Sequence, residues 1–494
     1  MQKKQNNGSF NREIQTKSKS LKLNALLNTV KTVLGIIFPL ITFPYISRIL
    51  SVNSIGSYNV ASSIISYCLL AAGLGVSTYA IREGSQYRND YEKMRQFTSE
   101  VFTINMYSTV SAYLILIICA IYVPVLHTYN IFLAILSIQI FFSTIGTNWL
   151  CNIYEDFLYI TIRTLAFQIL SLFFMFVFVK DETDIYAYLI ILTAANCVPN
   201  IINFYYIRKK YVKFKLLSCF DWKKHIKPIL IIFSTSITIT LYVNSDITIL
   251  GIMTNDYEVG LYSASVKIYT IIKNVMISVV MVLIPRFSIL FYNANGEAAS
   301  KLFSRVFNTI TLLLFPATVG MAVLSEDIIW LIAGDKYMEA GSSLCILSAA
   351  TVFALYAYMY TNCILIPKKK EKIVFIASVV SAVVNILLNI ILIPYWGINA
   401  AAITTALAEG IICVVTTCVG RKFLTMSNVI IPFLKVLFGC ALIIGFCVIM
   451  KSSMLSREMV IIISVIGSII IYMAAMIIFK HQVVIEYIYK FKRK

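Results

Sequence analysis

Four charged side chains lie inside apolar runs of this sequence and could do chemistry there. Asp246, Lys267 and Glu409 fall well within long hydrophobic segments, and Lys31 falls within the first of them. A charge inside a membrane-spanning segment costs several kilocalories per mole unless it faces water, a partner or a bound ligand. These residues are therefore candidates for a functional site. The alternative is an ion pair of Asp246 with Lys267 or Lys31 that serves only the fold.

Polar side chains at helical spacing accompany these charges. Residues three or four positions apart share one face of a helix, and such a face can line a wet cavity. Asn, Ser and Thr side chains also form hydrogen bonds between helices, and this structural role is the alternative for each of them. The predicted polar faces are Ser263, Lys267, Thr270, Asn274 and Ser278; Asn24, Asn28, Lys31, Gly35 and Thr42; Ser378, Ser381, Asn385 and Asn389; and Thr405 with Glu409.

Further cations lie outside these faces. Lys273 is off the face that carries Lys267, and we expect it at another helix contact. Arg48, Arg163 and Arg286 lie near the ends of apolar runs. Long side chains in such places reach the lipid head groups, which is the alternative to ligand binding for these three arginines.

Membrane-spanning helices must position all of these residues. The chain has 494 residues, of which 59% are hydrophobic and only 13% are charged, and its mean hydropathy is +0.82. Soluble proteins of this size do not have such a composition. Runs long enough to cross roughly 30 Å of hydrocarbon as helices recur along almost the whole chain. Hydropathy predicts about fourteen spans, centred on 25–48, 57–81, 99–123, 128–151, 156–179, 184–207, 226–253, 258–284, 303–325, 340–366, 372–395, 398–420, 428–450 and 458–479.

The basic residues predict how the chain crosses the membrane. They gather in alternate loops, most densely in the stretch 208–227, whereas the intervening loops hold few. Cytosolic loops are enriched in Lys and Arg, so this alternation predicts cytosolic N- and C-termini. Residues 1–20 have no signal-peptide pattern and are expected to be an uncleaved cytosolic tail. The net charge of +19 is thus a topology signal, and no nucleic acid partner is expected.

Motifs for catalysis or metal binding are missing from the sequence. It has no phosphate-binding loop and no HExxH, and its three histidines lie far apart. The eleven cysteines form no Cys-x-x-Cys pair, so neither a disulfide nor a metal site is expected. A membrane glycosyltransferase or polymerase would place acidic residues on a large outer loop, and the outer loops here are short. We therefore expect a protein that is not an enzyme.

An internal repeat predicts two related halves. The Gly56-x-Tyr58 turn recurs as Gly260-x-Tyr262, and the two glycines are 204 residues apart, which corresponds to six predicted spans. An even offset puts both turns on the same, outer side and makes the halves parallel repeats. The predicted organisation is a cytosolic tail 1–20, a six-helix bundle 21–207, a basic linker 208–225, a second six-helix bundle 226–420, two extra helices in 421–479 and a cytosolic basic tail 480–494.

Longer motifs give a resemblance to a known family. They are "SIGSYNVASSIISYCLLAAGLGVSTYAIRE" (54–83), "VGLYSASVKIYTIIKNVMISVVMVLIPRFS" (259–288), "ILIPKKKEK" (364–372) and "NILLNIILIPYWGINAAAITTALAE" (385–409). The chain resembles the polysaccharide transport family, that is, the Wzx-type oligosaccharide flippases of the multidrug, oligosaccharidyl-lipid and polysaccharide exporter superfamily. Asn385, Asn389 and Gly397 match its Asn-x3-Asn and Gly-x-x-Gly patterns, while Ala400 replaces the second glycine.

The resemblance implies a fold and a function. The fold is an all-α polytopic protein with two six-helix bundles around a central cavity and two further C-terminal helices. The implied function is translocation of undecaprenyl-diphosphate-linked oligosaccharide across the bacterial cytoplasmic membrane by ion-coupled alternating access. A cation-coupled multidrug antiporter is the first alternative, and a polysaccharide polymerase is the second. No cofactor is expected apart from an H⁺ or Na⁺ coupling ion.

The same resemblance, taken with the polar faces, assigns roles to residues. We expect a monomer in contact with membrane lipid that works beside a polysaccharide polymerase and a chain-length regulator. The expected diphosphate ligands are Lys31, Arg48 and Lys267; the expected sugar contacts are Asn28, Tyr58, Tyr242, Tyr262, Thr270, Asn274, Asn385 and Asn389; and the expected ion-coupling residues are Asp246 and Glu409.

Overall fold

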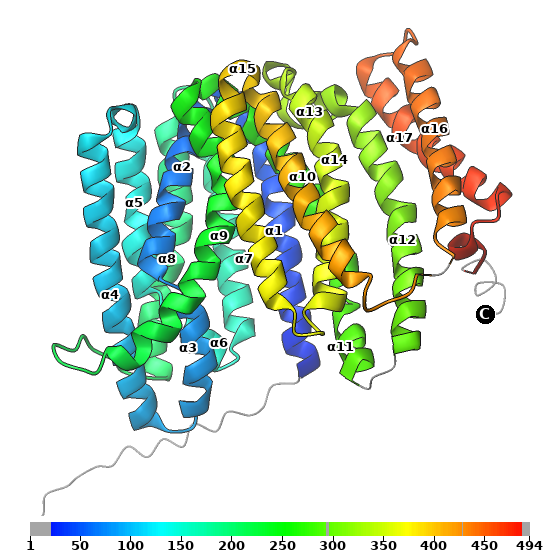
Figure 1. Ribbon diagram of the computed structural model, residues 1–494. Coiled ribbons are helices and arrows are strands. Elements are labelled where there is room, and N and C mark those ends of the chain that lie inside the picture. Colours follow the sequence, from blue (N-terminus) through cyan, green and yellow to red (C-terminus); the bar gives the residue numbers. More distant parts are fainter. Residues whose placement is uncertain (1–20, 293–295, 427, 487–494) are drawn as a thin grey trace, which may run out of the picture.

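The computed structural model describes residues 21–292, 296–426 and 428–486, without the side chains of residues 21–33 and 36. Over these residues the protein is built of helices and contains no strand. Most of the long helices run side by side between two ends of the molecule (Figure 1). This arrangement satisfies backbone hydrogen bonds within each helix, as a hydrocarbon environment requires.

Two sets of helices follow each other along the chain. We call the first set, α1–α8, the first bundle, and the set α9–α15 the second bundle. The first bundle comprises α1 (Leu21–Ile49), α2 (Val52–Gly73), α3 (Val76–Gly84), α4 (Tyr91–Tyr122), α5 (Asn130–Ile145), α6 (Asn148–Ile153), α7 (Phe157–Phe178) and α8 (Ile185–Lys210). The second comprises α9 (Lys223–Met253), α10 (Asp256–Met281), α11 (Ile284–Tyr292), α12 (Gly296–Val323), α13 (Ser325–Ala333), α14 (Ala340–Tyr360) and α15 (Glu371–Gly420).

Twelve helical segments of the described residues are long and apolar enough to cross a membrane. One of them, the 50-residue α15, has non-helical backbone at Gly397 (φ 50°, ψ −128°). The chain reverses there. The two limbs lie side by side, since Ser381 on the first limb donates a 2.7 Å hydrogen bond to the carbonyl of Ala408 on the second. The predicted spans 372–395 and 398–420 are thus the two limbs of α15. Helix α1 is not one of the twelve segments, because its described apolar part, Ile37–Ile49, is shorter than a membrane span. The number of fourteen crossings therefore stays a prediction.

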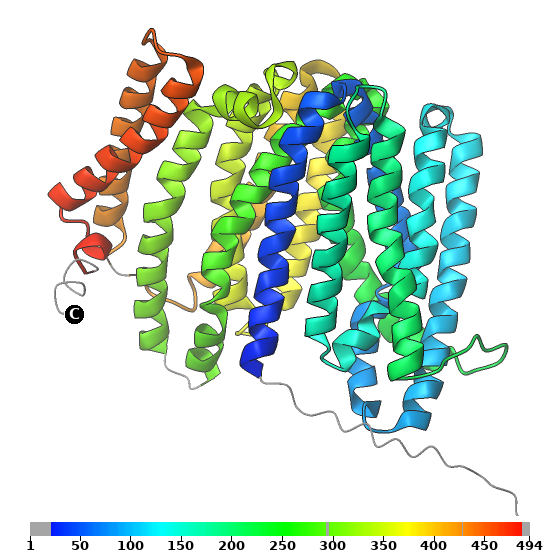
Figure 2. The same ribbon diagram turned by 180° about the vertical axis from the view of Figure 1, so that it is seen from behind.

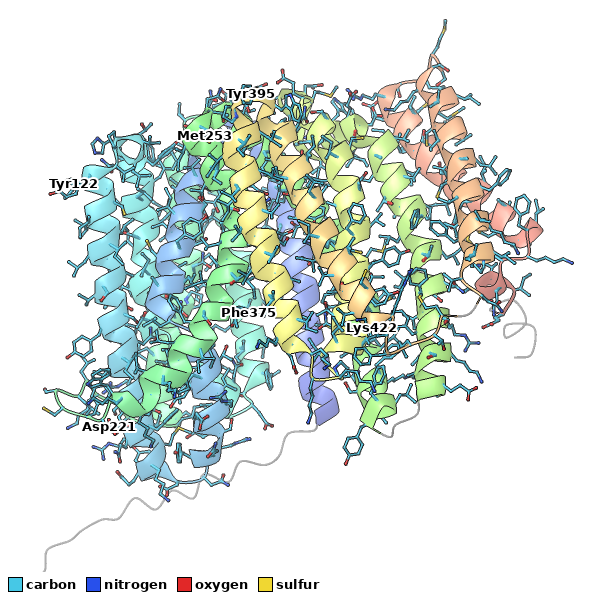
Figure 3. The ribbon with its side chains drawn as sticks, in the orientation of Figure 1. Tyr122, Asp221, Met253, Phe375, Tyr395 and Lys422 are labelled. Atoms are coloured by element: carbon cyan, nitrogen blue, oxygen red, sulfur yellow. The ribbon has the colours of Figure 1, made fainter. Side chains whose placement is uncertain are left out.

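The predicted alternation of loops is visible in the structure. Asp221, Phe375 and Lys422 lie at or near the basic loops, and all three are found toward the lower end of the molecule (Figure 3). Tyr122, Met253 and Tyr395 lie near turns that were predicted on the opposite side, and they are found at the upper end. The chain is a multi-pass membrane protein whose basic loops share one side, while the cytosolic location of that side stays a prediction.

The two turns of the internal repeat meet at the upper end. A Cβ atom added at Gly56 would lie 1.8 Å from the carbonyl oxygen of Asp256, and one added at Gly260 would lie 2.3 Å from that of Val52. The contact is reciprocal, since Asp256 and Gly260 follow Val52 and Gly56 by the same 204 residues. Only glycine permits so close an approach. The repeat seen in the sequence therefore lies about a pseudo-twofold axis at this contact.

Helix α9 joins the two bundles. Near its start, the buried His225 has Nδ1 at 2.7 Å from the Tyr79 hydroxyl of α3. Its Nε2 lies 2.9 Å from a Glu100 oxygen of α4. The other end of α9 packs against α15, where Ser245 donates to Asn385 (3.1 Å). Helix α9 thus begins on the first bundle and ends within the second.

Two further helices, α16 (Ile430–Lys451) and α17 (Arg457–Ile478), stand at one edge of the molecule (Figure 2). They are attached at the upper end by Asp327 of α13, whose two carboxylate oxygens bind Lys451 (3.1 Å) and Arg457 (3.0 Å). The two extra C-terminal helices predicted from hydropathy are present at these positions.

Candidate functional site

The carboxylate of Asp246 is the centre of a buried polar cluster in the second bundle. It accepts hydrogen bonds from Thr405 Oγ1 (2.5 Å), Asn389 Nδ2 (2.6 Å) and the Tyr262 hydroxyl (3.0 Å). Asp246 is only 7% exposed. Among the described residues, no Lys or Arg forms an ion pair with it. All the described partners of this buried carboxylate are thus neutral donors.

A second layer of amides and hydroxyls fixes these donors. Thr404 donates to Asn389 Oδ1 (2.5 Å), and Asn389 Nδ2 lies 3.3 Å from Asn385 Oδ1, which also accepts from Ser245. Asn385 and Asn389 are one helical turn apart on the first limb of α15, and the reversal at Gly397 brings Thr404 and Thr405 of the second limb beside them. We call Asp246, Tyr262, Asn385, Asn389 and Thr405 the Asp246 site.

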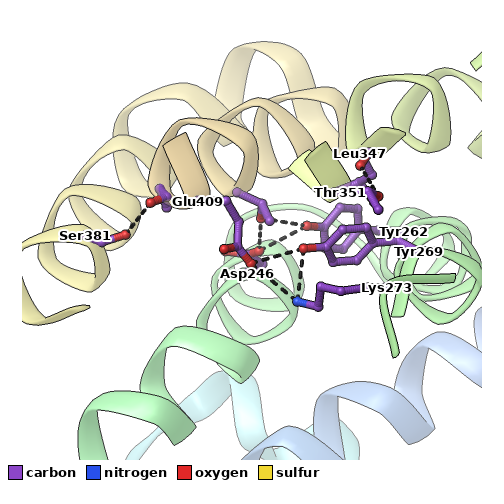
Figure 4. A network of polar contacts seen from close by, with 10 residues as sticks. Asp246, Tyr262, Tyr269, Lys273, Leu347, Thr351, Ser381 and Glu409 are labelled. Atoms are coloured by element: carbon purple, nitrogen blue, oxygen red, sulfur yellow. Dashed lines mark hydrogen bonds and ion pairs between the residues drawn. The ribbon is translucent and has the colours of Figure 1, made fainter. Parts of the chain in front are cut away.

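A second carboxylate, that of Glu409, lies on α15 one turn after Thr405 and has different partners. Glu409 accepts from the Tyr269 hydroxyl (3.1 Å) and from Lys273 Nζ (3.3 Å). Figure 4 shows Asp246 and Glu409 close together in one network, with Tyr262 and Tyr269 side by side to the right of both carboxylates and Lys273 below these rings. We call Glu409 and Lys273 the Glu409 pair. Among the described side chains, Glu409 has a cation and Asp246 has none.

The two predicted cations whose side chains are described, Lys267 and Arg48, have partners outside the Asp246 site. Lys267 is half-buried, with Nζ 5.4 Å from the ring centroid of Phe43 on α1, and it forms no ion pair among the described residues. The alternative of an ion pair between Asp246 and Lys267 is therefore wrong. Arg48 is exposed and donates to the carbonyl of Leu331 on α13 (2.7 Å). Lys31, like Asn28, has its side chain outside the described residues.

The predicted sugar contacts fall into two groups. Tyr262, Asn385 and Asn389 are buried within the Asp246 site, so they face no open space in this conformation and a sugar contact by them does not fit this geometry. Of the other five, Asn28 has its side chain outside the described residues, and four are not fully buried. They are Tyr58, whose ring meets that of Tyr188 edge-on at 5.5 Å; Tyr242, whose buried hydroxyl has no hydrogen-bond partner in the described chain; the half-buried Thr270; and the exposed Asn274.

Two residues that the sequence analysis left without a site have clear contacts in the structure, and one of them, Lys273, lies at another helix contact as expected. Lys273 is the partner of Glu409. It follows Tyr269 by four residues and so shares a helix face with it, and this spacing was the signal in the sequence. For Arg163, contact with the head groups was the alternative to ligand binding. It instead donates from Nη2 to Asn148 Oδ1 of α6 (2.6 Å) and lines a cavity inside the first bundle.

The chain was compared with known proteins. The family described as "Polysaccharide biosynthesis protein" matches residues 21–291. A putative O-antigen transporter of Shigella dysenteriae is 23% identical over 399 residues, covering 79% of this chain and 98% of that protein. A probable low-salt glycan biosynthesis flippase, Agl15 of Haloferax volcanii, is 28% identical over 166 residues, about a third of each chain.

Solved structures support the same fold. The lipid II flippase MurJ, in an inward closed conformation, superposes with a TM-score of 0.72 over 93% of this chain and 98% of that one, at 18% identity. At this identity the likeness speaks for the fold alone. The family match covers more than half of the chain. The chain therefore belongs to the polysaccharide biosynthesis protein family, and its resemblance to the polysaccharide transport branch of the multidrug, oligosaccharidyl-lipid and polysaccharide exporter superfamily is confirmed.

Proposed function

We propose that this protein is a flippase for undecaprenyl-diphosphate-linked oligosaccharide. It moves the repeat units of a surface polysaccharide across the cytoplasmic membrane by ion-coupled alternating access. The family match, the O-antigen transporter relative and the flippase-like fold support this function. None of these relatives is described as an enzyme, which favours transport over polymerisation.

The Asp246 site is the observation that carries the coupling. An ionised carboxylate buried without a cation is unfavourable, and binding H⁺ or Na⁺ removes the uncompensated charge. The amide oxygens of Asn385 and Asn389 and the hydroxyl of Thr405 lie within the same cluster. Oxygen ligands of this kind suit a hard cation. Glu409 is a weaker candidate than Asp246, because Lys273 already compensates its charge.

Helix α9 supplies the connection between ion binding and movement. Its start is fixed to the first bundle through His225, whereas Asp246 fixes its other half to α10 and α15. A cation at Asp246 would strengthen the second attachment and change how the bundles are held relative to each other. Outward opening would separate the contact at Gly56 and Gly260, where Asn59 donates to Ser263 across the pseudo-twofold axis (3.0 Å).

The diphosphate requires cations that are not already neutralised. Lys267 meets this requirement, since it lies against an aromatic ring of α1 and has no carboxylate partner among the described residues. Lys31 of α1 completes the proposed diphosphate site, and Arg48 receives the group near the outer end. Tyr58, Tyr242, Thr270 and Asn274 remain the proposed sugar contacts with Asn28, whereas Tyr262, Asn385 and Asn389 are reassigned to the cation site.

The proposal can be tested in vesicles loaded with the lipid-linked oligosaccharide. We expect the wild-type protein to move the oligosaccharide between leaflets faster under either an inward H⁺ or an inward Na⁺ gradient. The variant Asp246→Asn, which nearly keeps the size of the side chain but removes the charge, should lose the response to that gradient. An unchanged response in Asp246→Asn would contradict the coupling role. Elongation of repeat units by the purified protein would favour a polymerase, and export of cationic dyes would favour a drug antiporter.

A further inference from the structure

The loop that joins the two bundles has one side fixed to α4 and one side exposed. This α8–α9 loop, residues 211–222, projects sideways past α4, above the lower ends of α3 and α4 (Figures 1 and 2). The backbone N–H of Lys215 donates to the Ser99 hydroxyl of α4 (3.3 Å). The N–H of Leu217 donates to the Thr103 hydroxyl, one turn further along the same helix (3.0 Å). The position of the loop is therefore set by α4.

These two contacts place the loop at a boundary of the membrane. The last charged residue of α4 is Glu100, between Ser99 and Thr103, and residues 101–122 carry no charge. At a rise of about 1.5 Å per residue this uncharged part spans about 33 Å. That length matches a hydrocarbon core of roughly 30 Å. The loop thus lies at the level where lipid head groups meet the hydrocarbon.

The exposed side of the loop combines apolar and basic side chains. Leu216 is 57% exposed and Trp222 is 52% exposed. Tryptophan is enriched where membranes meet water, and basic residues at a membrane surface attract anionic lipids. The only acidic residue in 211–224 is Asp221. Four lysines of this stretch are exposed and form no ion pair among the described residues, and we call them the loop lysines: Lys213, Lys215, Lys223 and Lys224.

A groove begins at this loop and runs into the membrane. It has a volume of about 670 Å³ and lies between α4 on one side and the loop with the start of α9 on the other. Cys219, Phe220 and Trp222 line its lower end. Along α4 it continues from Ile104 to Ser111, about 10 Å, toward the apolar middle of that helix. A lipid of this leaflet, with its head group at the loop, would direct its acyl chains the same way.

We propose that the α8–α9 loop and this groove bind an anionic phospholipid of the surrounding leaflet. The phosphate lies against the loop lysines, Leu216 and Trp222 lie among the head groups, and an acyl chain follows α4 in the groove. The unpaired positive charge and the depth of the loop favour a lipid over a soluble protein as the occupant. The proposal concerns lipid binding alone, and it holds whether or not the protein is a flippase.

Binding of phosphatidylglycerol to the purified full-length protein tests the basic end of this site. We expect native mass spectrometry to show saturable binding at least about tenfold tighter than that of phosphatidylcholine. Replacement of all four loop lysines by Gln should weaken it about tenfold or more, because each basic residue near an anionic surface strengthens attachment severalfold. The matched control changes four exposed lysines at the lower end of the second bundle to Gln and should bind as the wild type does. These are Lys369, Lys370, Lys372 and Lys422.

The apolar end of the site is tested on α4. Ser111→Trp fills the groove from an exposed position and should weaken phosphatidylglycerol binding about tenfold. Val110→Trp is the matched control, since Val110 is exposed on the same helix but does not line the groove, and it should bind as the wild type does. In nanodiscs of phosphatidylglycerol with brominated acyl chains, Trp222→Phe should remove part of the fluorescence quenching that the wild type shows.

Each remaining outcome decides the proposal. Equal binding of the two lipids by the wild type would overturn it, as would equal binding by the loop-lysine variant and its control. If the loop-lysine variant does not fold, the two α4 variants decide, and equal binding by them would overturn it. Unchanged quenching in Trp222→Phe would mean that the loop lies in water, open to a soluble protein. Displacement of the lipid by glycerol 3-phosphate at equal concentration would indicate a site for free phosphate, and preferential displacement by undecaprenyl diphosphate would indicate a substrate site.

Discussion

Each bundle holds a charged group inside its helices that forms hydrogen bonds but no ion pair among the described residues, and these two charges have opposite signs. In the first bundle it is the guanidinium of Arg163, at the wall of an open polar cavity. In the second it is the carboxylate of Asp246, which is enclosed by hydroxyls and amides of its own protein. The open cation has room for a large anion, whereas the enclosed anion has room only for a proton or a small cation.

This difference assigns separate tasks to related halves of one chain. The repeat places Gly56 and Gly260 at equivalent positions, yet the polar residues around the two unpaired charges do not repeat. The scaffold is therefore shared while the ligand chemistry is not. The proposed difference between the bundles requires that Asp246 has no cation of its own. Replacement of that carboxylate tests this requirement most strongly.

Replacement of Asp246 should have the largest effect. Asp246→Ala removes the only carboxylate of the Asp246 site, so gradient-driven transport should fall about 100-fold, near the upper end of usual coupling free energies. Initial rates of oligosaccharide translocation in vesicles measure this. Asp181→Ala, in an exposed turn at the upper end, is the matched control and should transport at the wild-type rate. A rate for Asp246→Ala within about twofold of wild type, in the presence of the ion gradient, would contradict the comparison.

The Glu409 pair shows what a compensated carboxylate does in the same bundle. Lys273→Met leaves Glu409 buried without a cation, and it should destabilise the protein by about 3 kcal/mol, the low end for buried pairs because Lys273 is partly exposed. The double variant Lys273→Met, Glu409→Gln should recover most of this loss. Thermal unfolding of the four proteins in detergent gives the coupling free energy. Additive losses would mean that the two side chains do not act as a pair.

The contact between the bundles can be weakened without touching either charge. Gly56→Ala places a methyl group where the backbone of Asp256 already lies, so the helix ends must separate, at a cost of about 1–3 kcal/mol. We expect a lower free energy of unfolding and a less populated closed upper end, measured by accessibility of a label at Asn59. Gly320→Ala is the control, because its added methyl would meet nothing within 4 Å. Equal stability of both variants would argue against a tight contact.

The sequence predicted the helices well because their signal is local. Most of the predicted spans lie within a few residues of the observed helices, and the repeat at Gly56 and Gly260 marked the true contact. The partners of the charges depend on tertiary structure. Asp246 and Lys267 are 21 residues apart in the sequence, yet the folding of α15 at Gly397 surrounds Asp246 with Asn389 and Thr405 instead. In the sequence, Arg163 could not be told from an arginine that reaches the lipid head groups, because the cavity beside it is formed by four helices that are distant in the sequence.

The smallest effect is expected at a carboxylate that has two cations and no proposed ligand. Asp327 binds Lys451 and Arg457 at the upper end, and both basic side chains are about a third exposed. Asp327 is itself buried, but the two cations that Asp327→Asn leaves behind are partly exposed and can be solvated. The variant should therefore cost about 1 kcal/mol or less in unfolding free energy, with transport unchanged. Loosened attachment of α16 and α17 should appear as faster hydrogen exchange confined to the start of α17. A loss of transport as large as that for Asp246→Ala would mean that buried unpaired charge does not distinguish the functional carboxylate from the structural ones.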